Sequence, residues 1–171
     1  MRFMRAALLA AAVITPLIGV PAHAVEVVKV RPGMLVIDLR DAVEWHAGDG
    51  GRLAVSAAPD AGDIVRHLEL RAHEAGASWA VFALANTSDE QIERLIVVPH
   101  SQGTGSRVVG ITPSSLDRLD RQDDTAADMF RATLYPGAII TYVAELRGDA
   151  LPQIYLWKPD AFRALLERGP R

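Results

Sequence analysis

The chain has 171 residues, with 18 basic and 21 acidic side chains, a formal net charge of −3 and no cysteine. A chain of this size forms one domain with a sizeable core, and the lack of cysteine excludes disulfides, thiolate catalysis and thiolate metal sites. The mildly acidic balance offers no electrostatic surface for nucleic acid, so we expect none as a partner.

The first 24 residues have the pattern of a secretory signal peptide. Arg2 and Arg5 precede an uncharged apolar run that ends in "PAHA", where Ala22 and Ala24 form an A-x-A cleavage site. We therefore predict cleavage after Ala24 and export, most simply to a bacterial periplasm. No second apolar run is long enough to span a bilayer, so we expect no transmembrane helix in the mature chain.

Beyond Ala24 the apolar residues recur mostly with a period of two, which is typical of β-strands. In "IVRHLELRAH" the residues Ile64, Leu68, Leu70 and Ala72 alternate with polar ones, which predicts a half-buried strand. Weaker patterns predict further strands at Val25–Val30, Leu35–Leu39, Leu53–Ala57, Val108–Ile111 and Gln153–Trp157. The charged run "SLDRLDRQDD" is expected to be a solvated loop.

Four stronger strands are expected to form two hairpins. Both faces of Trp79–Ala85 are apolar, as in a strand buried on both sides, and the polar segment "NTSDEQ" leads from it to Ile92–Val98. In "DMFRATL" and "AIITYVAEL", apolar residues alternate with residues on the opposite face, where Thr141 and Glu145 are expected to point outward. Between these two, Pro136 and Gly137 suit the central positions of a type II turn.

The expected fold is an all-β antiparallel sandwich, jelly-roll-like, over residues 25–158, followed by a C-terminal helix and tail over 159–171. Pro159 suits the first turn of that helix, and Gly169 with Pro170 would end it. Phe162, Leu165 and Leu166 are expected to share its apolar face.

No catalytic constellation is evident, and the sequence predicts no cofactor. His100 beside Ser101, with aspartates elsewhere, could supply a hydrolase triad, but no serine lies in a nucleophile elbow. Metal binding is likewise not expected, because two sets of candidates lack ligand spacing: the histidines His46, His67 and His73, and the aspartates Asp123, Asp124 and Asp128. Surface histidines and a solvated acidic loop are the favoured interpretations.

Two features leave alternatives open. Asn86-Thr87-Ser88 fits the N-glycosylation sequon, although in a bacterial host Asn86 is more simply a turn residue. Trp45, Trp79 and Trp157 could form an aromatic platform for a sugar, against the alternative of core packing. Core packing is favoured for Trp79, whereas Trp157 is expected to be partly exposed.

An extended series of segments resembles a known family. "WAVFALANTSDEQIERLIVVPH", "ITPSS", "DRQ", "AADMFRATL", "PGAIITYVAELR" and "LPQIYLWKPDAFRA" together resemble the N-terminal periplasmic sensor domain of bacterial membrane-bound cyclic-di-GMP signalling proteins, which carry diguanylate cyclase or phosphodiesterase domains. That region is similar to the extracellular domain of seven-transmembrane receptors with diverse intracellular signalling modules. The resemblance spans roughly Val25 to Arg163.

The resemblance implies a non-catalytic, exported sensor or ligand-binding β-sandwich, an input domain for signal transduction. Its partner would be an unknown small ligand or a periplasmic or membrane protein, and the sequence designates no ligand-binding residue. In the family the final helix leads into membrane helices, whereas this sequence ends at Arg171, so we expect either a truncated sensor or a standalone protein. The alternative function is a freestanding carbohydrate-binding or adhesion module.

Overall fold

The structure is a computed structural model that describes residues 25–48, 51–59, 62–100, 105–123, 126–147 and 153–168. The expected signal peptide at 1–24 lies outside the described residues, as do Ser101, Asp124 and the end of the tail at 169–171. Within the described ranges, no helix is long and apolar enough to cross a membrane.

The described residues form mostly strands. The strands are β1 (Val27–Val30), β2 (Val36–Asp38), β3 (Glu44–His46), β4 (Arg52–Ser56), β5 (His67–Arg71), β6 (Ala77–Asn86), β7 (Ile92–Pro99), β8 (Arg107–Ile111), β9 (Leu116–Arg118), β10 (Arg121–Asp123), β11 (Ala127–Leu134), β12 (Ile139–Arg147) and β13 (Tyr155–Trp157). A single 3-10 turn, η1 (Arg40–Ala42), and one α-helix, α1 (Pro159–Glu167), complete the described elements.

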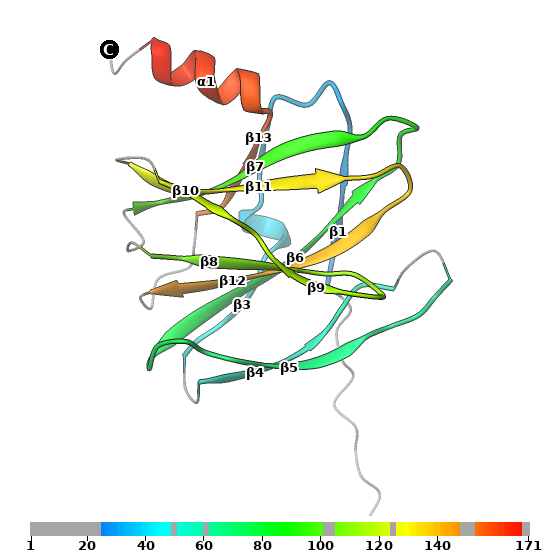
Figure 1. Cartoon of the computed structure of the whole chain (residues 1–171), viewed down its shortest axis with the longest axis vertical. Helices are drawn as coiled ribbons and strands as arrows, with labels where there is room; N and C mark the ends of the chain where they lie inside the picture. Colours follow the sequence, from blue (N-terminus) through cyan, green and yellow to red (C-terminus); the bar gives the residue numbers. More distant parts are fainter. Residues whose placement is uncertain are drawn as a thin grey trace, which may run out of the picture.

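The elements stack in four layers (Figure 1). A six-stranded sheet, in the order β1-β6-β12-β8-β9 with β3 also paired to β6, packs against a five-stranded sheet in the order β10-β11-β7-β13-β2. The hairpin β4–β5 covers the outer face of the six-stranded sheet, and α1 covers the outer face of the five-stranded sheet. The expected all-β sandwich with one short C-terminal helix is therefore confirmed.

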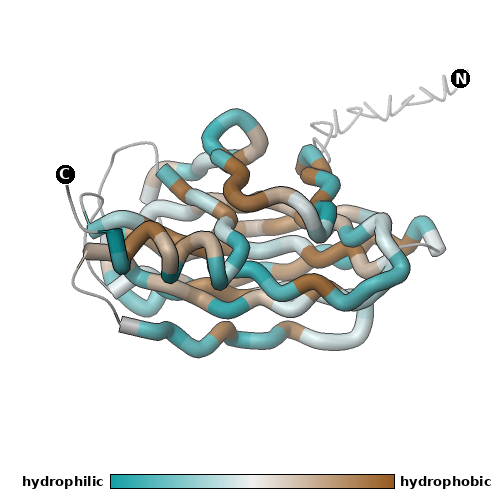
Figure 2. The backbone as a smooth tube through the Cα atoms, turned by 90° about the horizontal axis from the view of Figure 1, so that it is seen from above, coloured by the Kyte–Doolittle hydropathy of each residue, from teal (hydrophilic) through white to brown (hydrophobic). Residues whose placement is uncertain are grey.

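Strand β6 shows how the sequence produces these layers. Its even-numbered residues, such as Phe82, enter the core between the two sheets, while its odd-numbered residues, such as Trp79 and Val81, pack under the hairpin. All ten residues of β6 are buried, which explains why the sequence is apolar on both faces here. Figure 2 shows apolar and polar residues alternating along strands with only one covered face.

The prediction that Trp79–Ala85 and Ile92–Val98 form a hairpin is wrong. The two strands exist as β6 and β7, but they belong to different sheets, so the polar segment between them crosses from one sheet to the other. At the start of the crossing lies Asn86, which is 1% exposed. Its side-chain amide nitrogen donates hydrogen bonds to the carbonyls of Glu90 (2.7 Å) and Leu134 (2.9 Å), and its amide oxygen accepts from the backbone and hydroxyl of Ser88.

The second predicted hairpin is also a crossing between sheets, because β11 pairs with β7 and β12 pairs with β6. The turn itself has the expected form. Gly137 has a φ of +73°, and the Ala138 N–H donates to the Tyr135 carbonyl at 3.0 Å, as a type II turn requires. The backbone of Asn86 joins this turn too, bonding Gly137 and Ala138 at 3.0 Å each. Asn86 thus forms hydrogen bonds with both segments that cross between the sheets.

The pairing differs from a purely antiparallel sandwich at one edge. Strand β1 runs parallel to β6 and pairs with its last four residues, from Ala83 to Asn86. Strand β3 then pairs antiparallel with Trp79 to Val81 on the same edge of β6. Between β1 and β3 the chain leaves the six-stranded sheet to form β2 in the other sheet. The parallel strands β1 and β6 are therefore joined by a long connection, as parallel pairing requires.

The five weaker strands are all confirmed, but three short strands were missed. These are β3, β9 and β10, and the last two lie within the run expected to be a loop. Three side chains also differ in burial from the expectation. Ile64 lies outside β5 and is 62% exposed, and Leu165 and Leu166 of α1 are about half exposed, leaving Phe162 as the buried residue of that helix.

Thr141 was expected to point outward and is instead 1% exposed beneath the covering hairpin. Its hydroxyl accepts a hydrogen bond from the Ala58 backbone N–H at 2.8 Å. The outward face of β12 is therefore an interior surface, and this bond helps to anchor the segment that follows β4.

Arg94 is an interior cation that the alternation of β7 did not predict. It is 3% exposed, and its guanidinium donates to the carbonyls of Glu93, Arg31, Pro32 and Met34. Burial lowers the pKa of Arg94 from its ordinary value. Because the carbonyls before β2 are its acceptors, Arg94 holds the connection from β1 to β2 against β7.

We predict that Asn86→Ala destabilises the protein by about 3 kcal/mol, because it leaves the buried carbonyl of Leu134 and the N–H of Ser88 without their partner. Urea unfolding followed by circular dichroism measures the change. Thr87→Ala, at an exposed neighbouring position, is the matched control and should change stability little. A loss below about 1 kcal/mol for Asn86→Ala would contradict the role given to this residue.

Candidate functional site

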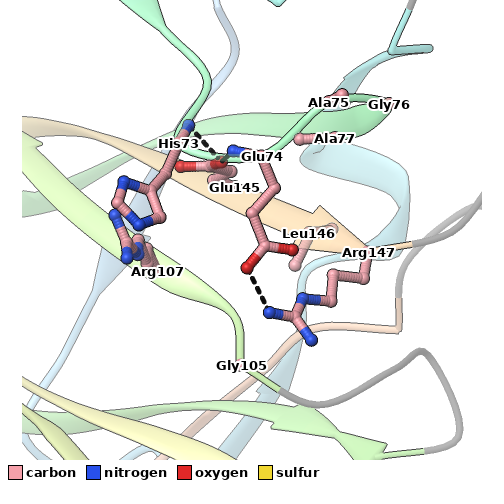
Figure 3. Close-up of a pocket in the computed structure, with 10 residues that line it drawn as sticks. All are labelled: His73, Glu74, Ala75, Gly76, Ala77, Gly105, Arg107, Glu145, Leu146 and Arg147. Carbon is pink, nitrogen blue, oxygen red and sulfur yellow. Dashed lines mark hydrogen bonds and ion pairs between the residues drawn. The ribbon is translucent and has the colours of Figure 1, made fainter.

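Three adjoining hollows form a cleft on the hairpin side of the six-stranded sheet and at its open end. Their volumes are about 260, 290 and 340 Å³. The walls come from the connection between β5 and β6, the start of β8, the strand β9 and the end of β12 (Figure 3 shows the first hollow). Arg107, the first residue of β8, lines all three hollows and is the centre of this cleft, which we call the Arg107 cleft.

A network of hydrogen bonds fixes one wall of the Arg107 cleft. The Glu145 carboxylate on β12 accepts the backbone N–H groups of His73 (2.7 Å) and Glu74 (3.3 Å), and the Glu74 carboxylate forms an ion pair with Arg147 (Figure 3). Both acidic side chains therefore have partners from the protein itself. Glu145 ties the connection between β5 and β6 to a central strand.

Three arginines of the cleft, Arg71, Arg107 and Arg118, have no such partner among the described residues. Among the described residues, neither Arg107 nor Arg118 forms an ion pair or a side-chain hydrogen bond. The strand register places both on one face, since Arg118 lies opposite Val109, two residues along β8 from Arg107. Diagonal neighbours of this kind have Cβ atoms roughly 7–8 Å apart, within reach of each other's long side chains.

The rest of the lining divides into a polar and an apolar part. The hollow of about 340 Å³ contains four arginines, Arg107, Arg118, Arg121 and Arg147, with Glu74 as its acidic residue. The hollow of about 290 Å³ shares Arg107 and Arg118 and also contains Arg71, His73 and Glu145. The rest of its lining is apolar: Leu70, Ala72, Trp79, Val109, Leu116 and Val143. The two parts meet at Arg107 and Arg118.

A second polar cluster lies at the adjacent edge of the five-stranded sheet. The Asp128 side chain on β11 is 3% exposed, contacts His100 Nε2 at 3.2 Å, and accepts the Ser106 backbone N–H at 2.7 Å. Burial alone would raise the pKa of Asp128. The hydrogen bonds from Ser106 and His100, with the positive charge of Arg121, nevertheless hold that pKa below its ordinary value.

This cluster bears on the hydrolase alternative. The structure brings His100 to an aspartate, as a triad would require, but Ser106 binds the Asp128 carboxylate through its backbone N–H at 2.7 Å, and in a triad that carboxylate is the group that orients the histidine. Ser101, the serine adjacent to His100 in sequence, lies outside the described residues. The described geometry thus accounts for Asp128, His100 and Ser106 as a structural cluster that joins β7, β8 and β11.

The other histidines lie at separate places. His46 contacts Glu44 at 3.0 Å, His67 contacts the Ser56 hydroxyl at 2.9 Å, and His73 lines the Arg107 cleft. Asp123 lies opposite Asp128 in the β10–β11 pair, and Asp124 lies outside the described residues. Across the described ranges, no group of three or more histidine or acidic residues could hold a metal ion.

The tryptophans do not form a common platform. Trp79 is 4% exposed in the core beneath the hairpin, as expected for a packed residue. Trp157 is partly exposed, also as expected, but it contacts Phe162 of α1 edge-to-face with ring centres 5.7 Å apart. Trp45 is partly buried on β3, and its indole N–H is buried with no hydrogen-bond partner among the described residues.

Sequence reasoning missed the arginines of the cleft. They come from β8, from the charged run containing β9 and β10, and from the end of β12, so no local motif contains them. The available signal was weak: Arg107 and Arg147 occupy the same alternation face as the apolar Val109 and Val143. Only the strand register reveals that these positions lie side by side.

Comparison of the chain with protein-family models, with curated proteins and with solved structures found no match.

We predict that Asp128→Asn reduces stability at pH 7 by about 1–3 kcal/mol, because the ionised carboxylate holds Ser106 and His100 better than an amide does. A carboxyl whose pKa is lowered by folding stabilises the protein above its unfolded value of about 3.9, and this contribution is lost as pH falls through the folded value. The difference between wild type and variant should therefore shrink below about pH 4.

Urea unfolding from pH 7 down to pH 3 measures this difference. Asp120→Asn, at an exposed position, is the matched control and should follow the wild-type pH profile. If the profiles of Asp128→Asn and wild type run parallel through the acid range, the ionised carboxylate does not carry the stabilisation.

Proposed function

We propose that the protein is a non-catalytic, exported β-sandwich that binds a small ligand, of the kind that forms the periplasmic input domain of a membrane signalling protein. Its ligand site is the Arg107 cleft. The proposal draws on the sequence resemblance, which implies a sensor sandwich, and on a fold of the implied class.

The position of Arg107 is the observation that best supports the cleft as the ligand site. It is partly buried, it lines three adjoining hollows, and it forms no ion pair among the described residues, although Glu145 lies opposite it in the β8–β12 pair. Withdrawing a guanidinium from water without a partner costs free energy, and a ligand that supplies acceptors would recover that cost. Small-molecule sites typically combine an apolar lining with a few such polar groups.

A route for output is also available. The helix α1 is docked by Phe162 against the outer face of the five-stranded sheet, in contact with residues such as Leu95 and Met129. A ligand that favours one arrangement of the sandwich would shift the population of states, and α1 could pass that difference to a periplasmic or membrane protein partner. In the family that the sequence resembles, this helix precedes the membrane part.

The test is a ligand screen by two-dimensional amide NMR, using the purified protein and a library of small metabolites. We expect at least one compound to shift the amides of β8, β9 and β12, and to be recovered chemically unchanged. Arg107→Ala should weaken that compound's binding by about tenfold or more, the loss of roughly one charge-assisted hydrogen bond.

Arg131→Ala is the matched control for this screen. It removes the same charge but lies on β11, where Arg131 contacts Glu93 at 3.0 Å, away from the cleft lining. Binding should survive in the control. Compounds that shift only other regions, that bind Arg107→Ala as well as wild type, or that are consumed would each overturn the proposed function.

A further inference from the structure

Resting on the proposed function, we propose that the ligand of the Arg107 cleft is a small organic anion with an apolar body. Its carboxylate or phosphate group binds Arg107 and Arg118, and its apolar part lies against Leu70, Val109 and Leu116. The class thus comprises aromatic or branched aliphatic carboxylates and phosphate esters.

The charge of the cleft points to an anion. The whole chain carries a net charge of −3, yet the polar hollow gathers four arginines against Glu74. Arg147 is already paired with Glu74, and the charge of Arg121 acts on Asp128. Of the remaining charged residues in the lining, Arg71, Arg107 and Arg118 are positive and Glu145, opposite Arg107 in the β8–β12 pair, is negative. The charge left for a ligand is therefore +2, enough to match one dianionic group.

The chemistry of arginine narrows the choice of group. A guanidinium presents several N–H donors in a planar fork that matches the oxygens of carboxylate and phosphate. Arg107 and Arg118 project from neighbouring strands on one face, so both forks can converge on one group. A neutral sugar would supply hydroxyls but would leave both charges without a counter-ion.

The apolar part of the lining indicates that the anionic ligand also carries an apolar group. The hollow that shares Arg107 and Arg118 continues over Leu70, Val109 and Leu116. Leu116 is 43% exposed, on a strand whose other two residues are charged. An apolar group placed there would cover that surface, which inorganic phosphate could not do.

The dimensions of the cleft favour a small molecule over a polymer. Each hollow measures between about 260 and 340 Å³, at or near the lower end of the range for small-molecule pockets. A nucleic acid would need basic residues spread over a wider surface, and the remaining charge of the chain is acidic.

The experiment is isothermal titration of the purified protein with four probes. Phenyl phosphate and phthalate combine an anion with an aromatic ring, inorganic phosphate supplies the anion alone, and phenyl β-glucoside supplies a ring with neutral hydroxyls. We expect at least one of the two aromatic anions to bind, inorganic phosphate to bind about tenfold or more weakly, and the glucoside not to bind. Comparing phenyl phosphate with phthalate distinguishes a phosphate from a carboxylate ligand.

Variants locate the site and separate charge from geometry. Arg107→Ala and Arg118→Ala should each weaken the aromatic anions by about tenfold, and Arg107→Lys should weaken them less, because it keeps the charge but loses the fork. Arg131→Ala should bind like wild type. Raising salt from 50 to 300 mM should weaken binding in wild type, as expected for partly exposed charges. Amide NMR spectra establish that each variant is folded.

The outcomes separate this inference from the proposed function. If the glucoside or another neutral compound binds and Arg107→Ala abolishes its binding, the cleft is a ligand site but the anion inference is wrong. If the aromatic anions bind wild type, Arg107→Ala and Arg118→Ala equally, binding is non-specific and the inference is wrong. If none of the probes binds and the metabolite screen also finds no ligand for the cleft, both proposals fail together.

Discussion

The sandwich depends on the hydrogen bonds of one buried amide. Asn86 ends β6 at the point where the chain leaves the six-stranded sheet, and its side chain and backbone bond to both segments that cross between the sheets. Buried backbone groups in such crossings have no ladder to satisfy them, so another polar group must. Asparagine suits the position because one side of its amide donates and the other accepts. Because the Asn86 amide nitrogen already donates to two carbonyls, it is not available for glycosylation at the Asn86-Thr87-Ser88 sequon.

Fixing the crossings allows the long strands to be covered on both faces. β6 and β12 place one face in the core between the sheets and the other beneath the hairpin, and even Thr141 is used inside this packing. Where β8 begins, the end of the covering hairpin and the connection from β5 to β6 line hollows beside Arg107. The Arg107 cleft occupies that position, so charged residues occur there on the alternation face that is apolar elsewhere.

The alternation of apolar and polar residues predicts which side chains are buried, but it does not predict which strands pair or pack together. The strong strands were predictable for that reason, and the helix start at Pro159 was predictable because proline suits the first turn of a helix. Pro136 and Gly137 specify the turn type, but a tight turn can join neighbours in one sheet or link two sheets, and so both hairpin predictions were wrong. Strands β9 and β10 were missed because they pair through their backbones, while the side chains of β9 and of Arg121 and Gln122 in β10 remain exposed. The cleft arginines become a group only through the register of β8 with β9 and β12.

The lengths of the outermost strands have a consequence for solution behaviour. In the described parts of the two main sheets, the outer positions belong to β1, β2, β3, β9 and β10, which have three or four residues each, while the long strands lie inside. A short edge offers few unpaired backbone groups as a template for another chain, which limits edge-to-edge aggregation. Other molecules are therefore expected to contact the side chains of this protein more than to pair with its strand edges.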